Sequence, residues 1–419
     1  MTQRPKVFAY YFPDWHKDPR NASWFGDAWD EWQLVKSATP RFDGHRQPRQ
    51  PAAGYFDESD PEIASEQISL ARSHGVDGFL VDFYWYDDGH YLNAALDRGL
   101  LAAENSSDVT IALMWANHEL VDIFPLSVSS DERPRRLRDG AIDRAAFERM
   151  ARHVVQNYFT QPNYYRVEGK PWFSIYEIGN LVTGLGGIDE THDALRWFDD
   201  LARAAGFAGV HLDAVIWGVD LLPRSVATIG SESTDVDPVD LVPSLGFSSV
   251  TSYVWVHHAE IAEFDFPRAD MAALRESAFD EYEDYAGRLA VPFHPNVTVG
   301  WDSSPRLAPA VPFVPGDYPA YPVWDSTPEE FGEGLRRARR FVSEHPTPHP
   351  IVTINAWNEW SEGSMLLPDT HHGDGFLRQV LEVFGPVENA DATDRVLDAE
   401  DEGREPLEPV SASGSEEVR

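Results

Sequence analysis

Two glutamates near the end of the chain, Glu359 and Glu362, have the residue type and spacing for acid–base chemistry. They follow an apolar, β-branched run at residues 351–356 that predicts a buried strand. Carboxyl groups at the end of a buried strand are costly unless they are paired or used, so their position favours a general acid and a general base. The alternative is an ordinary helix start, where glutamates interact well with the helix dipole. A helix start does not need the adjacent Trp357 and Asn358, so we favour the chemical interpretation.

Eight apolar runs recur along the chain, and predicted helices separate most of them. The runs occupy residues 6–12, 76–84, 109–116, 171–177, 210–217, 247–255, 296–301 and 351–356. The predicted helices lie near 61–74, 91–104, 142–159, 188–205, 269–288 and 328–344. This alternation predicts a (β/α)8 TIM barrel. A doubly wound sheet is the alternative, but no Gly-rich phosphate loop follows the first run. Residues 13–60, which are rich in tryptophan, predict a long ordered insertion after the first strand that covers the barrel mouth.

The barrel prediction identifies a second set of candidates, because active sites of such barrels lie at the carboxyl ends of the strands. The predicted substrate-binding residues are Tyr11, Trp15, His16, Asp82, Tyr84, Trp85, Trp115, Asn117, Glu119, Glu177, Tyr253, Trp301, Asp302, Asn355, Trp357 and Asn358. Aromatic rings pack on the apolar faces of sugars, and carboxylates and amides bond their hydroxyls. A phosphate site would need Gly-rich loops and basic residues, which this set lacks. Taken singly, Asp82 could instead cap a helix and Trp115 could fill the core, so the prediction of a glycan site depends on the joint pattern.

Composition excludes several classes of partner. The formal net charge is −36, from 34 basic and 70 acidic residues, and a field of that sign repels nucleic acid and anionic membranes. There is no cysteine, which excludes disulfides and thiolate metal sites. The adjacent histidines at 257–258 and 371–372 point different ways and do not predict a metal, so no metal or cofactor is expected. No signal peptide or apolar stretch of 18 residues is visible, which predicts a cytoplasmic protein without membrane insertion.

The last part of the chain differs from the rest. Residues 387–419 are mostly acidic or small, with little apolar content. Such a composition predicts a disordered, solvated tail. We therefore predict one catalytic barrel over residues 1–386 and an acidic tail over residues 387–419. The pattern leaves the oligomeric state open.

Several motifs resemble those of the WbsX-type, glycoside hydrolase family 99-like proteins. The similar segments are Tyr10-Tyr11-Phe12-Pro13, Trp15-His16, Glu31-Trp32, residues 44–48, residues 54–57, Trp115-Ala116-Asn117, residues 301–306 and residues 355–363. Together they extend from about residue 6 to 384. The resemblance implies a (β/α)8 barrel. It also implies either a retaining, endo-acting α-mannosidase or a glycosyltransferase of surface polysaccharide or O-antigen synthesis.

The resemblance also implies roles for the two glutamates. Glu359 is the base that deprotonates the sugar 2-hydroxyl, which then attacks C1 to give a 1,2-anhydro intermediate. Glu362 protonates the leaving oxygen and later activates water. The sequence departs from the family pattern at His118, where relatives often have glutamate directly after the asparagine, and at Leu367, where they often have glutamate before the proline. Both departures bear on the identity of the sugar.

Three functions remain open from the sequence. A retaining hydrolase of an α-linked oligo- or polysaccharide is favoured. A glycosyltransferase would need cationic groups for a phosphate-bearing donor, and Arg46 and Arg306 are the ready candidates. A non-catalytic glycan-binding barrel would keep the aromatic residues but would not need both Glu359 and Glu362.

Overall fold

The computed structural model describes residues 4–125, 134–217 and 238–387, and the following account concerns these residues. Apart from Val387, the predicted acidic tail lies outside them. Within this part of the chain no helix has both the length and the apolar character to cross a membrane.

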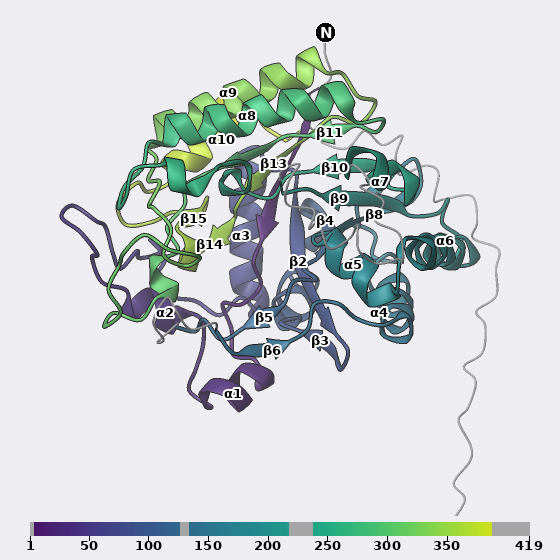
Figure 1. Ribbon diagram of the computed structural model, residues 1–419, viewed down its shortest axis with the longest axis horizontal. Helices are drawn as coiled ribbons and strands as arrows, with labels where there is room; N and C mark the ends of the chain where they lie inside the picture. Colours follow the sequence, from purple (N-terminus) through teal and green to yellow (C-terminus); the bar gives the residue numbers. More distant parts are fainter. Residues whose placement is uncertain (1–3, 126–133, 218–237, 388–419) are drawn as a thin grey trace, which may run out of the picture. The chain divides into compact units, whose positions relative to one another are not determined.

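Parallel strands form a nearly closed barrel, which confirms the predicted (β/α)8 TIM fold (Figure 1). The barrel strands are β1 (Lys6–Tyr11), β2 (Gly78–Tyr86), β4 (Thr110–Trp115), β8 (Lys170–Ile175), β9 (His211–Val215), β10 (Ser249–Thr251), β11 (Phe293–His294), β12 (Asn296–Thr298) and β13 (Ile351–Asn355). β13 pairs back with β1, from Lys6 opposite Ile351 to Ala9 opposite Ile354. The seventh strand of the barrel is interrupted at Pro295, which has no N–H to donate. Its first part, β11, pairs with β10, and its second part, β12, pairs with β13.

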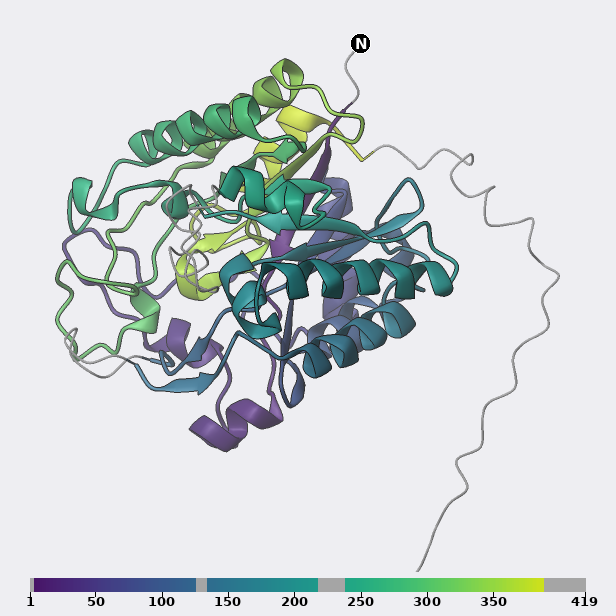
Figure 2. The same ribbon diagram turned by 45° about the vertical axis from the view of Figure 1, so that its right-hand side comes forward.

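Helices pack around the outside of the barrel. They are α3 (Pro61–Ser73), α4 (Arg144–Asn157), α5 (Ile178–Leu185), α6 (Ile188–Ala204), α7 (Pro238–Ser244), α8 (Met271–Arg288), α9 (Pro328–Glu344) and α10 (Gly375–Phe384). Figure 2 shows α4 and α6 side by side as two blue-to-teal helices. The start of α9 illustrates the sequence signal: Thr327 and Glu330 form a reciprocal capping box, and Pro328 occupies the first turn. Phe331, Leu335, Ala338 and Phe341 then recur at helical spacing and are buried.

The helix predicted at residues 91–104 is wrong in its first part. β2 continues to Tyr86 and forms a hairpin with β3 (Gly89–Tyr91), in which Tyr84 lies opposite Tyr91. Gly89 has a φ of +105°, a conformation that favours glycine and allows the tight turn. A π-helical turn at Ala95–Leu100 follows. The aromatic alternation at the end of β2 favoured a longer strand over a helix.

The insertion after β1 is ordered and lies at the end of the barrel toward which β1 and β2 point (Figure 1). It contains α1 (Pro19–Phe25) and α2 (Trp32–Ser37). The Trp32 indole donates to the Phe56 carbonyl at 2.7 Å, which ties α2 to the last part of the insertion. Short paired strands complete the described part: β5 (Leu120–Val121) with β6 (Arg136–Arg138), β7 (Arg166–Val167) with β8, and β14 (Asn358–Glu359) with β15 (Ser364–Met365).

Candidate active site

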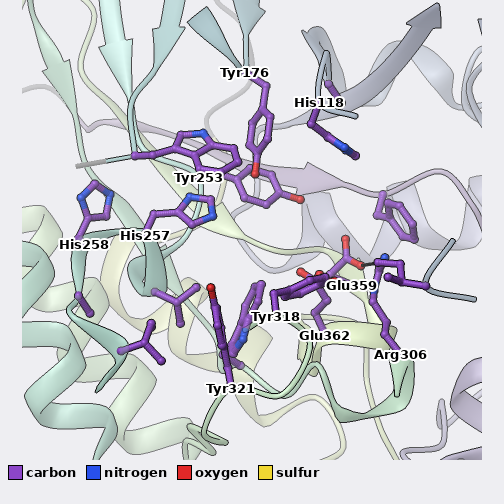
Figure 3. Close-up of a pocket in the computed structure, with 18 of the residues that line it drawn as sticks. His118, Tyr176, Tyr253, His257, His258, Arg306, Tyr318, Tyr321, Glu359 and Glu362 are labelled. Atoms are coloured by element: carbon purple, nitrogen blue, oxygen red, sulfur yellow. Dashed lines mark hydrogen bonds and ion pairs between the residues drawn. The ribbon is translucent and has the colours of Figure 1, made fainter. Parts of the chain in front are cut away.

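A cavity of about 1180 Å³ lies at the carboxyl ends of the strands. Figure 3 shows Glu359, Glu362, Arg306 and Tyr318 grouped on one side, with Tyr253 and Tyr176 across from them. The residues that line the cavity also include Phe12, Asp14, Asp82, Tyr84, His118, Trp217, His257, Trp301 and Tyr321. A volume of this size accommodates more than one sugar ring, because typical small-ligand sites measure about 300–1,000 Å³.

The two glutamates stand on a short hairpin after β13. Glu359 ends β14, residues Trp360–Glu362 form a single 3-10 turn, and the chain returns as β15. Gly363 closes the turn at a φ of +67°, and a Cβ there would lie 2.7 Å from the Cβ of Asp302. The hairpin replaces the ordinary helix start that was the alternative interpretation, and it places both carboxyl groups on the cavity wall.

One guanidinium connects the acidic groups of the site. Arg306, in the 3-10 turn Ser304–Arg306, places Nη2 3.0 Å from Oε1 of Glu359 and Nε 3.6 Å from Oε1 of Glu362. The same Nη2 lies 3.7 Å from Oε1 of Glu31, which precedes α2 in the insertion. All three carboxyl groups are buried or nearly so, and they share a single positive charge. At least one proton is therefore expected among them at neutral pH.

The two glutamates differ in the hydroxyl groups that contact them. Tyr318 donates its hydroxyl to Oε1 of Glu362 at 2.5 Å, and Ser361 donates to Oε1 of Glu359 at 3.3 Å. Burial, followed by the charge of Glu362, raises the pKa of Glu359 well above its ordinary value, while Arg306 acts in the opposite direction. Two neighbouring carboxyls that resist simultaneous ionisation can supply one acid and one base.

A further carboxyl group, Asp82, faces the cavity from β2. Its Oδ2 accepts a hydrogen bond from the Tyr253 hydroxyl at 3.1 Å, while its buried Oδ1 has no hydrogen-bond partner. Burial raises the pKa of Asp82 well above its ordinary value. A protonated Asp82 can both donate to and accept from a sugar hydroxyl.

Seven of the residues predicted from the sequence line this cavity: Asp82, Tyr84, Glu119, Tyr253, Trp301, Glu359 and Glu362. The other eleven do not line it, and strand geometry explains much of the difference. Successive side chains of a strand point to opposite faces. Asp82 and Tyr84 therefore face the cavity, whereas Trp85 points away and stacks on His90 at 4.8 Å. Similarly, Met114 and Ala116 line the cavity, whereas the Trp115 indole donates to the Trp85 carbonyl.

Several of the remaining predicted residues have structural contacts that account for their polarity. Asn117 bonds both the backbone N–H and the carbonyl of Glu177, and the Glu177 carboxylate caps α5 by accepting from Gly179. Asp302 accepts from His45 at 2.8 Å and from Gln47 at 2.7 Å. These contacts place the three side chains in the framework around the cavity.

The predicted residues closest to the glutamates in sequence hold the hairpin. Asn358 bonds the backbone N–H and carbonyl of Phe12 at 2.8 Å each, and also Glu58 at 2.7 Å. The Trp357 indole donates to Gln67 at 2.8 Å. Asn355 is fully buried at the end of β13. These residues orient Glu359 from behind the wall of the cavity.

The predicted residues after β1 are buried outside the cavity. Tyr11 packs against Phe79 with ring centroids 5.3 Å apart, and Trp15 packs against Trp32 in a tilted arrangement at 4.1 Å. Both ring nitrogens of the buried His16 lack a hydrogen-bond partner, and burial lowers the pKa of this side chain. The cavity is lined instead by Phe12 and Asp14.

Tyr318 and Glu31 were not predicted from the sequence as site residues, and Arg306 was predicted only as a candidate phosphate ligand. Tyr318 comes from a proline-rich loop after the seventh strand position, and Glu31 comes from the insertion. Neither lies at the end of a barrel strand, so the expectation that site residues follow the carboxyl ends of the strands does not identify them. In the described ranges, no group of three or more His, Asp or Glu residues has the arrangement of a metal site.

Comparisons with known proteins agree with this architecture. A family model described as "Glycosyltransferase WbsX" matches residues 7–380. The "Uncharacterized protein WxcX" of Xanthomonas campestris pv. campestris is 30% identical over 390 residues, which cover 90% of this chain and 49% of the relative. The chain thus spans about half the length of the curated relatives it matches.

Solved structures share the fold at low sequence identity. A glycoside hydrolase-like protein superposes with a TM-score of 0.59 at 13% identity, over 92% of this chain and 95% of that one. The GH99 endo-alpha-mannosidase from Bacteroides thetaiotaomicron superposes with a TM-score of 0.52 at 14% identity, over 91% and 97%.

Proposed function

The chain belongs to the WbsX family, and from that premise we propose that it is a retaining glycoside hydrolase that cleaves an α-linked, mannoside-like glycan with Glu359 and Glu362. The observation that supports this most is the pair of carboxyl groups on the cavity wall, both contacted by the single guanidinium of Arg306. A pair of carboxyls that shares a proton meets the main requirement of glycoside cleavage.

The proposed first step breaks the bond between C1 and the leaving oxygen. Glu359 takes the proton of the sugar 2-hydroxyl as O2 attacks C1, and Glu362 gives its proton to the departing oxygen. The product of this step is a 1,2-anhydro sugar and a free alcohol. Arg306 favours charge on Glu359, the nearer carboxyl, and the Tyr318 hydroxyl orients Glu362. Arg306 thus opposes the burial that raises the pKa of Glu359, as the role of a base requires.

The proposed second step restores both glutamates. Glu362, now ionised, takes a proton from water as that water attacks C1, and Glu359 returns its proton to O2. Two successive inversions at C1 give net retention. The phenolic groups of Tyr84, Tyr176 and Tyr253 lie around the cavity, where they can bond sugar hydroxyls. Asp82 offers a buried oxygen that needs a partner.

A glycosyltransferase is the second candidate, because the matching family model carries that description. A phosphate-bearing donor requires a cation that is free to contact it. Arg306 is held by Glu359, Glu362 and Glu31, while Arg46 contacts His372 and Asp325 outside the cavity lining. Among the described residues, these contacts favour hydrolysis over transfer from a nucleotide sugar.

One experiment tests the proposal directly. The protein is incubated with α-mannosides, other α-glycans and nucleotide sugars, each with and without an acceptor, and products are identified by mass spectrometry. The doubly substituted Glu359→Gln, Glu362→Gln protein is the matched control. We expect hydrolysis of at least one α-glycan and none by the control. Sugar transfer from a nucleotide donor without hydrolysis would favour the second candidate, and binding without conversion would favour a non-catalytic barrel.

A further inference from the structure

Glu31 is a buried carboxyl that the proposed steps do not use. Its side chain is fully buried in the insertion, and neither oxygen has a hydrogen-bond partner. Although Glu31 occupies the N-cap position of α2, its side chain makes no capping hydrogen bond. A buried carboxylate without such bonds costs folding free energy, so local helix stability does not account for its placement.

The contact that Glu31 does make is with the shared guanidinium. Oε1 of Glu31 lies 3.7 Å from Nη2 of Arg306, the same atom that lies 3.0 Å from Glu359. Glu31 therefore competes with the proposed base for one positive charge. It approaches from the insertion, whereas Glu359 approaches from the hairpin after β13. Arg306 is thus held between two elements that are far apart in the sequence.

We propose that Glu31 is a positioning residue for the glutamate pair, which fixes Arg306 between Glu359 and Glu362 and, by drawing on its charge, keeps a proton within the pair near neutral pH. This positioning role rests on the proposed function, whereas the electrostatic coupling of Glu31, Arg306 and Glu359 is a property of the folded protein alone. Glu31 itself is not among the residues that line the cavity, although it contacts Arg306, which is.

The acidic groups near Glu31 also disfavour its ionised form. Asp14 follows β1 and faces it, and burial together with the charge of Glu31 raises the pKa of Asp14 well above its ordinary value. Asp30 is the neighbour along the chain, and Glu362 approaches from the hairpin. Arg306 and the Ser361 hydroxyl oppose them, since both lower the pKa of Glu31. Burial prevails, and the pKa of Glu31 rises to about 7.

The consequence of removing this charge has a definite sign. Glu31→Gln deletes a negative neighbour of Glu359 and releases Arg306 to interact with the pair. Both effects favour ionised Glu359, so its carboxyl titrates at lower pH than in the unsubstituted protein. The expected shift is about one pH unit for a single charge at this range in a partly polar interior.

The experiment is carboxyl ¹³C NMR on the full chain labelled at glutamate Cδ, with signals assigned through Glu31→Gln, Glu359→Gln and Glu362→Gln. Glu177→Gln is the matched control, because burial also raises the pKa of Glu177 to about 7 but this side chain caps α5 and, within the described part of the chain, makes no contact with the glutamate hairpin. We expect the Glu359 signal to titrate about one pH unit lower in Glu31→Gln and to keep its midpoint in Glu177→Gln. An unchanged midpoint in Glu31→Gln, or an equal shift in the control, would overturn the proposal.

This titration requires no substrate, so its outcome is independent of whether the protein cleaves glycans. A shifted Glu359 midpoint in a protein that turns over no glycan would keep the coupling and reject the proposed function. In an active protein, the acidic limb of the kcat/KM profile, which reports ionisation of the base, should move by the same amount toward lower pH. A fall in kcat at all pH values with an unmoved limb would indicate a merely structural Glu31 and would contradict the proposal.

Discussion

Replacing Arg306 with methionine should destabilise the protein in a strongly pH-dependent manner. Arg306 is the cation within 4 Å of Glu359, Glu362 and Glu31. Methionine fills a similar volume but leaves three buried or nearly buried carboxyls without a compensating charge. Removing one partner of a buried ion pair costs about 3–5 kcal/mol. For a folded part of this size, that loss corresponds to a fall in Tm of about 4–6 °C.

The sign of the pH dependence follows from the direction of the pKa shifts. Burial raises the folded-state pKa of Glu359 and of Glu31 above the ordinary value of about 4.3, so these groups stabilise the fold when protonated. That contribution is complete below the ordinary value and is lost as the pH rises through the folded-state pKa. Without Arg306 the folded-state values rise further. The destabilisation should therefore be small near pH 5 and reach its full size near pH 8.

Thermal unfolding at several pH values measures this effect. Arg306→Lys keeps the charge but loses the planar fork, so it should fall between the unsubstituted protein and Arg306→Met. Arg336→Met is the control, since Arg336 pairs with Glu333 on the surface of α9 and such pairs contribute about 0–1 kcal/mol. A loss of Tm that is equal at pH 5 and pH 8, or no loss at either, would refute the shared-charge account.

Two further predictions concern the whole chain. The formal net charge of −36 should make Tm rise between low and molar salt, because screening reduces self-repulsion in the compact state; a flat or falling Tm in a salt series would contradict this. Truncation after Pro386 should leave Tm and activity nearly unchanged, because residues 387–419 carry little apolar surface; a fall of several degrees on scanning calorimetry would show that they stabilise the barrel.

The barrel could be predicted from the sequence because its strands are short, buried and regularly spaced. The run ending at Asn355 is β-branched at every position from Ile351 to Ile354 and leads directly into the glutamates, and both glutamates line the cavity. The hairpin that holds them could not be predicted, because β14 and β15 contribute two residues each. Such short strands carry no period, and their pairing is set by contacts from Asn358 to Phe12 across the barrel end.

The site prediction was least accurate where it ignored the alternation of side chains. Tyr84 and Trp85 were both chosen because they end the same strand, but they point to opposite faces. Parity along each strand would have separated Asp82 and Tyr84 from Trp85, and Ala116 from Trp115. Arg306, Tyr318 and Glu31 come from loops whose positions depend on tertiary contacts, and these have no local sequence signal.

The most direct test of the central claim is the turnover of Glu359→Gln and Glu362→Gln on two α-mannosides, one with an alkyl leaving group and one with an acidic phenol. Each substitution keeps the shape and removes a proton acceptor or donor, which should reduce turnover of the alkyl substrate by about 10²–10⁴-fold. Because a phenol needs little protonation to depart, Glu362→Gln should lose less activity on the aryl substrate than on the alkyl substrate, whereas Glu359→Gln should lose activity on both alike. Near-normal turnover of both substrates by both variants, with the fold intact by circular dichroism, would contradict the assignment of these glutamates.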